Sequence, residues 1–244
     1  MEEKKPILEH IEDLRKTLFH SLIGLFAGII LASFFVNPIV AYLARPIGGL
    51  EALNAIEVTE SIGVYMRVAL LMGLIIALPW IFYQLFKFSA KGLKEKEKKA
   101  ILIAVPFATL MFIAGVAFAF YIMLPASLDF LTGILAVQTQ IRIKSYFSFV
   151  SNLLFWIGLG FEMPLMAYVL ARFGLIKAKS MLKGWRFAIV AIAILAAVIT
   201  PTSDPVNMAI FMIPLFVLYL LSIGLVAIAE RRRAKTAETE KTEV

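Results

Sequence analysis

The chain has 244 residues, of which 61% are hydrophobic and only 17% are charged. A water-soluble domain needs a more polar composition to cover its surface, so these values exclude a soluble enzyme and a disordered chain. No cysteine is present, which excludes disulfide bonds and thiolate metal or redox sites. The formal net charge of +7 is compatible with nucleic-acid binding or with membrane orientation, and the positions of the charges decide between the two.

Six apolar stretches predict transmembrane helices, because crossing the hydrocarbon core takes about 20 helical residues. The fifth stretch has only 14 residues and is followed by a run that contains Pro201, Asp204 and Pro205, so a re-entrant fifth segment is the alternative. We expect an all-α integral membrane protein whose last two spans are short. The predicted spans are 17–36, 62–86, 100–124, 146–171, 187–200 and 208–229.

The basic residues alternate between the segments that join these spans. Twenty of the 24 lysines and arginines lie at the two chain ends and in the second and fourth connecting segments. By the positive-inside rule, both termini then face the cytoplasm of a cell membrane, and the net charge is an orientation signal with no need for nucleic acid. We expect one six-span domain over 1–230, with an amphipathic cytoplasmic helix at 6–16, and a basic then polar, disordered cytoplasmic tail at 231–244.

Glu162 is the outstanding polar residue inside a predicted span, about 15 Å from that span's cytoplasmic end. A charged group in the bilayer is costly, so a functional role is the default interpretation. The alternative is a protonated glutamate that bonds a neighbouring helix. Pro164 predicts a kink beside it. Kinked helices of unequal length favour a concave surface, and the other prolines that predict kinks or turns are Pro46, Pro79, Pro125, Pro201 and Pro214.

Two predicted cytoplasmic segments combine charges with apolar side chains. The segment after Pro6 carries an apolar helical stripe, which indicates either a membrane anchor or a binding helix. The loop 87–99 contains six lysines together with Phe88, Leu93 and Glu97. Such a run is usually a solvated orientation signal. However, Glu97 has no basic partner four residues later, and a carboxylate beside apolar side chains is able to accept a guanidinium group in bidentate fashion.

Catalytic and cofactor motifs are missing from the sequence. His10 and His20 are ten residues apart and do not form a metal-ligand pattern, and no phosphate-binding loop occurs. We therefore expect neither a cofactor nor an enzyme. Two other classes stay open from the residues alone: a proton-coupled secondary transporter of a small solute that uses Glu162, and, less favoured, an intramembrane enzyme.

Several motifs follow one another in order along the chain. They are His10-Ile-Glu-Asp-Leu-Arg15, Pro79-Trp-Ile-Phe-Tyr-Gln84, Gly92-Leu93, Glu97-Lys98, Phe161-Glu-Met-Pro164 and Thr200-Pro201 with Asp204. Together they resemble the TatC family, the multispanning receptor of the twin-arginine protein translocase. The match is not complete. Asp13 stands where the family has glutamate, Lys91 replaces the loop proline, and Met208 and Leu220 occupy positions that are polar in many members.

The resemblance implies a function in protein export driven by the proton-motive force. Glu97 would be the principal carboxylate for the paired arginines of a cargo signal peptide, and Asp13 the second. The remaining signal-peptide residues implied by the resemblance are His10, Leu14, Arg15, Phe88, Gly92, Leu93 and Lys98. It also implies a homo-oligomer and docking of the single-span partners TatA and TatB at the last two spans, around Thr200, Met208 and Pro214.

Overall fold

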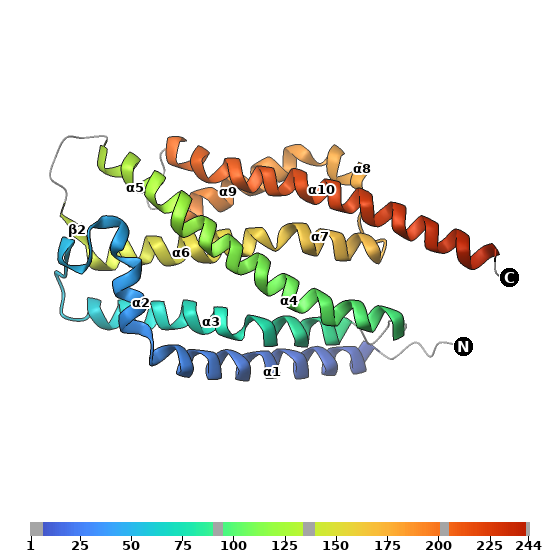
Figure 1. Cartoon of the computed structure of the whole chain (residues 1–244), viewed down its shortest axis with the longest axis horizontal. Helices are drawn as coiled ribbons and strands as arrows, with labels where there is room; N and C mark the ends of the chain where they lie inside the picture. Colours follow the sequence, from blue (N-terminus) through green and yellow to red (C-terminus); the bar gives the residue numbers. More distant parts are fainter. Residues whose placement is uncertain (1–6, 90–94, 134–139, 201–204, 243–244) are drawn as a thin grey trace. The chain divides into compact units, whose positions relative to one another are not determined.

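The computed structural model describes residues 7–89, 95–133, 140–200 and 205–242 (Figure 1). Almost all of these residues are helical, which confirms an all-α membrane protein. The long helices are α1 (Ile7–Ser33), α3 (Glu60–Ser89), α4 (Glu95–Phe118), α6 (Ile143–Phe161), α9 (Trp185–Ile199) and α10 (Pro205–Thr242). The shorter helices are α2 (Val36–Leu43), α5 (Leu124–Gly133), α7 (Met163–Arg172), α8 (Ala178–Lys183) and the 3₁₀ turns η1 (Arg45–Ile47) and η2 (Leu50–Ala52).

Within the described ranges, five helical segments are long and apolar enough to cross a membrane. They are Ile11–Ser33, Glu60–Phe88, Ala104–Leu131, Ile143–Arg172 and Pro205–Arg233. The remaining predicted span corresponds to α9, an apolar helix of 15 residues. All six predicted apolar stretches are therefore helical, while the number of full spans and the side on which the termini lie stay predictions.

The N-terminal part of the chain differs from the prediction. An amphipathic helix at 6–16 was expected to precede a separate span that ends at residue 36. Instead, α1 runs without interruption from Ile7 to Ser33, and a turn at residues 34–35 separates it from α2. α1 contains no proline, so no proline interrupts the helix between its charged N-terminal residues and the apolar residues that follow.

The C-terminal part also differs from the prediction in two respects. The last span is not short, because Pro205–Arg233 covers 29 residues. Furthermore, α10 continues to Thr242, where a disordered tail had been expected. Alanine, lysine, arginine and glutamate make up most of residues 231–241, and these are good helix formers that extend a helix already nucleated by the apolar span.

The chain divides into two compact units. The first contains Met1–Ile113 and Gln140–Ser151, and the second contains Ala114–Thr139 and Asn152–Val244. In the first unit, α1 and α3 run side by side in opposite directions (Figure 1). Glycines bring the two backbones close: a Cβ atom added at Gly28 would lie 2.4 Å from the carbonyl oxygen of Gly73. The Tyr65 hydroxyl also donates a 2.7 Å hydrogen bond to the carbonyl of Ser33.

A small sheet joins two distant segments of the first unit. Strand β1 (Leu53–Asn54) pairs in parallel with strand β2 (Ile141–Arg142), so that Leu53 faces Ile141. The buried hydroxyl of Tyr146 donates a 2.6 Å hydrogen bond to the carbonyl of Leu43. These contacts place the residues just before α6 against the segment between α2 and α3.

The second unit packs α10 against α7 and α9. A Cβ atom added at Gly160 would lie 2.6 Å from a methyl carbon of Leu215, and one at Gly115 would lie 2.9 Å from the backbone of Gly158. The glycines thus allow close helix packing in the membrane, where small residues take the place of a hydrophobic driving force. A π-helical turn, η4 (Ala119–Met123), precedes Pro125, which cannot donate a hydrogen bond to the carbonyl of Tyr121.

Candidate functional site

The start of α1 and the end of α3 form one end of the first unit. The Trp80 indole nitrogen donates a 3.0 Å hydrogen bond to the carbonyl of His20, which marks a point of contact between the two antiparallel helices. Asp13 precedes His20 by seven residues and Phe88 follows Trp80 by eight. At 1.5 Å per residue these distances are about 10 and about 12 Å along nearly parallel axes, so Asp13 and Phe88 lie at the same level.

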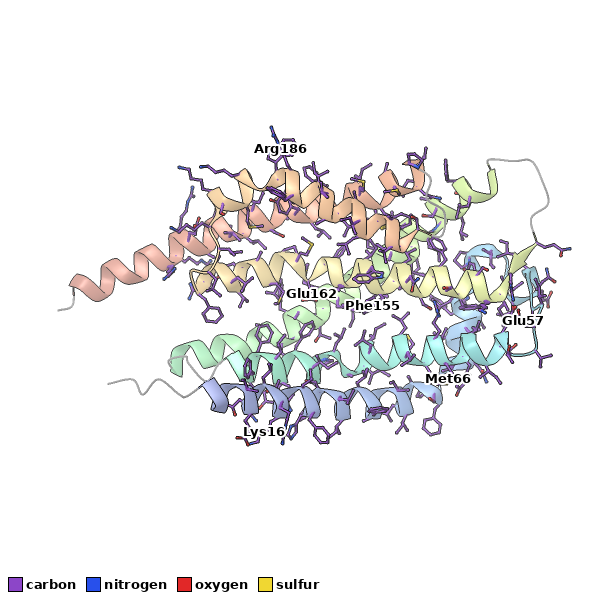
Figure 2. All side chains as sticks on the ribbon, turned by 180° about the vertical axis from the view of Figure 1, so that it is seen from behind. Lys16, Glu57, Met66, Phe155, Glu162 and Arg186 are labelled. Atoms are coloured by element: carbon purple, nitrogen blue, oxygen red, sulfur yellow. The ribbon has the colours of Figure 1, made fainter. Side chains whose placement is uncertain are left out.

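The side chains at this end combine charge with apolar surface. Asp13 and Phe88 are half-buried, whereas Leu14 and Arg15 are exposed. Leu14 is therefore an apolar group that is available to a ligand beside two charged residues. One turn further along, Lys16 pairs with Glu12 at 2.8 Å, and both side chains are more than half exposed. Such an exposed pair stabilises the helix little and leaves this surface hydrated (Lys16 is labelled in Figure 2).

The other predicted binding residues are described only in part. His10 lies in α1, and Glu97 and Lys98 lie in the first turn of α4, but their side chains fall outside the described part of the structure. Gly92 and Leu93 lie outside the described residues altogether. Only five residues separate Ser89 from Glu95, so the start of α4 is within about 22 Å of the end of α3.

Glu162 lies in the second unit at the break between α6 and α7 (Figure 2). Its side chain is only 4% exposed, in agreement with the expectation of a buried carboxyl group inside a span. Pro164 occupies the first turn of α7, and the expected interruption of the helix is present. Asn207 near the start of α10 is a further buried polar side chain in this unit, which the sequence did not single out.

The residues predicted to dock partners lie around the start of α10. Thr200 ends α9, is buried, and donates a 3.0 Å hydrogen bond from its hydroxyl to the carbonyl of Ala196. Met208 and Pro214 are partly exposed on α10, and Pro214 lies inside this helix. Pro201 and Asp204 lie outside the described residues.

The remaining predicted structural prolines are found in three different settings. Pro46 is the second residue of the 3₁₀ turn η1. Pro79 lies inside α3, where its ring is exposed. Pro125 is the second residue of α5 and follows the π-helical turn η4.

An ion cluster in the first unit was missed by the sequence interpretation. Arg142 donates hydrogen bonds to Glu60 at 2.5 Å and to Glu57 at 2.8 Å. These bonds, that to Glu60 first, raise the pKa of the Arg142 guanidinium above its ordinary value. Glu60 begins α3 and is only 2% exposed. The available signal was the pair of glutamates just before an apolar helix, where acidic residues favour the positive end of the helix dipole.

Arg67 makes a second contact between helices of the first unit. Its guanidinium donates a 2.6 Å hydrogen bond to the hydroxyl of Ser148, so it joins α3 to α6 within the first unit.

The fold and the buried carboxyl group define a multi-pass helical membrane protein with polar groups held among its spans. Residues 9–229 match the family model of the Sec-independent protein translocase protein TatC. The chain belongs to this family.

Individual relatives support the same assignment. The chain is 36% identical to TatC of Carboxydothermus hydrogenoformans, over 91% of this chain and 93% of that protein. It is 34% identical to TatCy of Bacillus subtilis, over 96% and 94% of the two chains. Its fold is similar to the crystal structure of a twin-arginine translocase receptor, TatC, with a TM-score of 0.82, 32% identity, and coverage of 90% of this chain and 99% of that one.

Proposed function

We propose that this chain receives twin-arginine signal peptides of folded cargo proteins at its cytoplasmic face. Membership of the TatC family carries this proposal, and the solved relative is described as a receptor. The geometry of the first unit supports the location of the site. Asp13 and Phe88 lie at one level, and the start of α4, with Glu97, follows within a short connection.

The chemistry of the site suits a ligand with two guanidinium groups next to an apolar segment. In the proposed complex, Glu97 and Asp13 accept hydrogen bonds from the two arginines. A planar guanidinium group binds a carboxylate in bidentate geometry, which lysine is unable to reproduce. Leu14, Phe88 and Leu93 receive the apolar part of the signal, while His10, Arg15, Gly92 and Lys98 complete the surface.

The proposal includes a topology and partners. Six spans place both termini in the cytoplasm, as the basic residues predict. TatA and TatB dock around Thr200, Met208 and Pro214, several copies of the chain work together, and transport draws on the proton-motive force. The short helix α9 supports this docking site, because a span of 15 residues leaves room for a single-span partner at its end.

Photocrosslinking in membranes tests the signal-peptide site. A photoreactive residue at position 14 or 88 should crosslink to a twin-arginine signal peptide, and an Arg-Arg to Lys-Lys change in the peptide should reduce the yield. Glu97→Gln should weaken recognition about tenfold or more, because it leaves an arginine without its carboxylate. Glu95→Gln removes a charge from the same helix turn and should change recognition little.

The result that would overturn the proposal is equally specific. If the Glu97→Gln protein is present at normal levels in membranes and still crosslinks like the unchanged protein, Glu97 does not bind the arginines. Equal crosslinking of the Arg-Arg and Lys-Lys peptides at both positions would show that this site does not recognise the paired arginines.

A further inference from the structure

The second unit carries an exposed basic surface around α8. We define the α8 basic surface as Lys177, Lys179, Lys183, Arg186 and Arg233, all of which are exposed. Residues 163–203 contain no aspartate or glutamate, so neighbours in the sequence do not neutralise the first four of these charges. Figure 2 shows Arg186 pointing outward from the start of α9. A concentration of positive charge of this kind attracts anionic groups.

The elements that carry this surface are held together by specific contacts. The Tyr219 hydroxyl on α10 donates a 2.6 Å hydrogen bond to the carbonyl of Met181 in α8. At the end of α7, Gly174 has a φ of +77°, and a Cβ atom added there would lie 1.6 Å from a guanidinium nitrogen of Arg233. Arg233 therefore packs directly on this glycine. The basic residues of α8 and of α10 thus have fixed positions in one unit.

Gly174 also explains why Arg233 fits this place. Its N–H bonds the carbonyl of Ala171 at 2.9 Å, and the N–H of Leu175 bonds the carbonyl of Leu170 at 3.0 Å. This pair of bonds is a Schellman ending, which requires a left-handed residue after the helix. The negative end of the α7 dipole favours a cation here, so it stabilises the guanidinium of Arg233 at the surface.

Apolar and aromatic side chains alternate with the basic ones. Leu182 is 56% exposed, Trp185 is 48% exposed and Phe187 is 82% exposed. The guanidinium of Arg186 lies 5.7 Å from the centre of the Trp185 ring. Exposed tryptophan and leucine beside lysine and arginine are typical of the boundary between lipid headgroups and acyl chains. The apolar residues indicate that the anion is part of a membrane.

The length of α9 brings the headgroups to these charges. Its 15 residues extend about 22 Å, less than the roughly 30 Å of the hydrocarbon core. Lys183 and Arg186 lie just before and at the start of this helix. Charged side chains are unfavourable in hydrocarbon. Lys183 and Arg186 are therefore expected at the level of the headgroup phosphates of the nearer membrane surface.

We infer that the α8 basic surface is a binding site for the phosphate groups of anionic phospholipids. Charge complementarity selects an anionic headgroup, and Trp185 and Leu182 contact the adjoining acyl chains. The inference does not depend on the signal-peptide site, which lies in the first unit, or on which side of the membrane this surface faces.

Native mass spectrometry of the purified full chain tests the inference. The detergent-solubilised protein is titrated with phosphatidylglycerol and, separately, with phosphatidylcholine of the same acyl chains. Phosphatidylglycerol should bind more tightly, and Lys179→Gln/Lys183→Gln/Arg186→Gln should weaken it by about fivefold for each charge removed. Added salt should weaken it further, while inorganic phosphate that replaces chloride at constant ionic strength should not compete, because phosphate lacks the acyl chains.

The matched control removes three exposed lysines from the first unit, as Lys16→Gln/Lys87→Gln/Lys144→Gln, and should retain phosphatidylglycerol binding. A charge-preserving variant, Lys179→Arg/Lys183→Arg, should also retain it, which separates lost charge from lost fold. Equal binding of the two lipids, competition by inorganic phosphate, or the same loss in the α8 variant and the first-unit control would overturn the inference.

Discussion

The indole nitrogen of Trp80 on α3 bonds the carbonyl of His20 on α1 at 3.0 Å, across 60 residues of sequence. Together with the close approach of Gly28 to Gly73 and the bond from Tyr65 to Ser33, this bond fixes which residues of the two helices lie opposite each other, and with them the level of Asp13 and Phe88. The indole N–H of Trp80 therefore helps to position the residues at the proposed binding end of the first unit.

Replacing Trp80 with phenylalanine should keep most of the ring volume and remove this bond. We expect a loss of about 0.5–1.5 kcal/mol in the free energy of unfolding, the usual net value of one hydrogen bond. Thermal unfolding in detergent measures it. Trp185→Phe is the matched control, since its side chain is 48% exposed against 45% for Trp80, and a smaller loss for Trp80→Phe than for Trp185→Phe would contradict the assigned role.

Close packing of α1 on α3 should depend on the absence of a side chain at Gly28. The added methyl group of Gly28→Ala would meet the backbone oxygen of Gly73 at 2.4 Å, and a backbone atom is unable to move aside as a flexible side chain does. We expect a loss of about 1–3 kcal/mol, typical of overpacking.

Gly63→Ala is the control on the neighbouring helix, because no atom lies within 4 Å of a Cβ added there. Gly63→Ala should be neutral or slightly stabilising. Both variants are compared by urea or thermal unfolding in the same detergent. If they behave alike, the close approach of α1 and α3 at Gly28 does not exist in the folded protein.

The ion cluster at the start of α3 should depend more on its Arg142–Glu60 pair than on its Arg142–Glu57 pair. Arg142→Gln leaves the carboxylate of Glu60, which is only 2% exposed, without its cation and should lower the stability much more than Glu57→Gln does. Glu57→Gln should cost about 0–1 kcal/mol, because the Glu57 side chain is 57% exposed.

A double-mutant cycle of Arg142→Gln with Glu60→Gln separates the pair from the rest of the site. The double variant should recover part of the stability lost in Arg142→Gln, since no buried charge then stays unpaired. A double variant as unstable as the sum of the two single variants would show that the two residues do not interact.

Gly174→Ala should disturb the end of α7 in two ways. A non-glycine residue at a φ of +77° costs about 1–2 kcal/mol, and the new methyl group would displace the guanidinium of Arg233. Gly224→Ala in α10 is the matched control, since nothing lies within 4 Å of its added Cβ, and it should be neutral or stabilising. Thermal unfolding of the two variants in detergent measures the difference. Equal stabilities would show that position 174 does not require a glycine.

The apolar spans could be predicted because lipid imposes a simple rule on them, namely long apolar helices with charges outside. The limits of single helices were less predictable. Two helix boundaries were not predicted: the continuation of α1 from its charged into its apolar part, and the end of α10 beyond Arg233. Both depend on whether a helix that has already formed continues through residues of good helix propensity. No breaker stands at either place, so both helices continue.

The motifs name the candidate site, which stays a prediction, but they do not reveal the contacts that position its residues. Asp13 and Phe88 were named from the sequence, whereas the bond between Trp80 and His20 joins two residues that no local pattern connects. The same holds for Arg142, which no motif in the sequence singles out. Its partners Glu57 and Glu60 are more than 80 residues away and become neighbours only through the pairing of β1 with β2.

The discontinuity of the first unit has a consequence for the biosynthesis of the protein. Its last segment, Gln140–Ser151, is made only after the ribosome has produced the helices α4 and α5. Until then β1 has no partner strand, Glu60 has no arginine, and the Leu43 carbonyl has no tyrosine. The first unit therefore reaches its full set of contacts only after the segment that closes it has been synthesised.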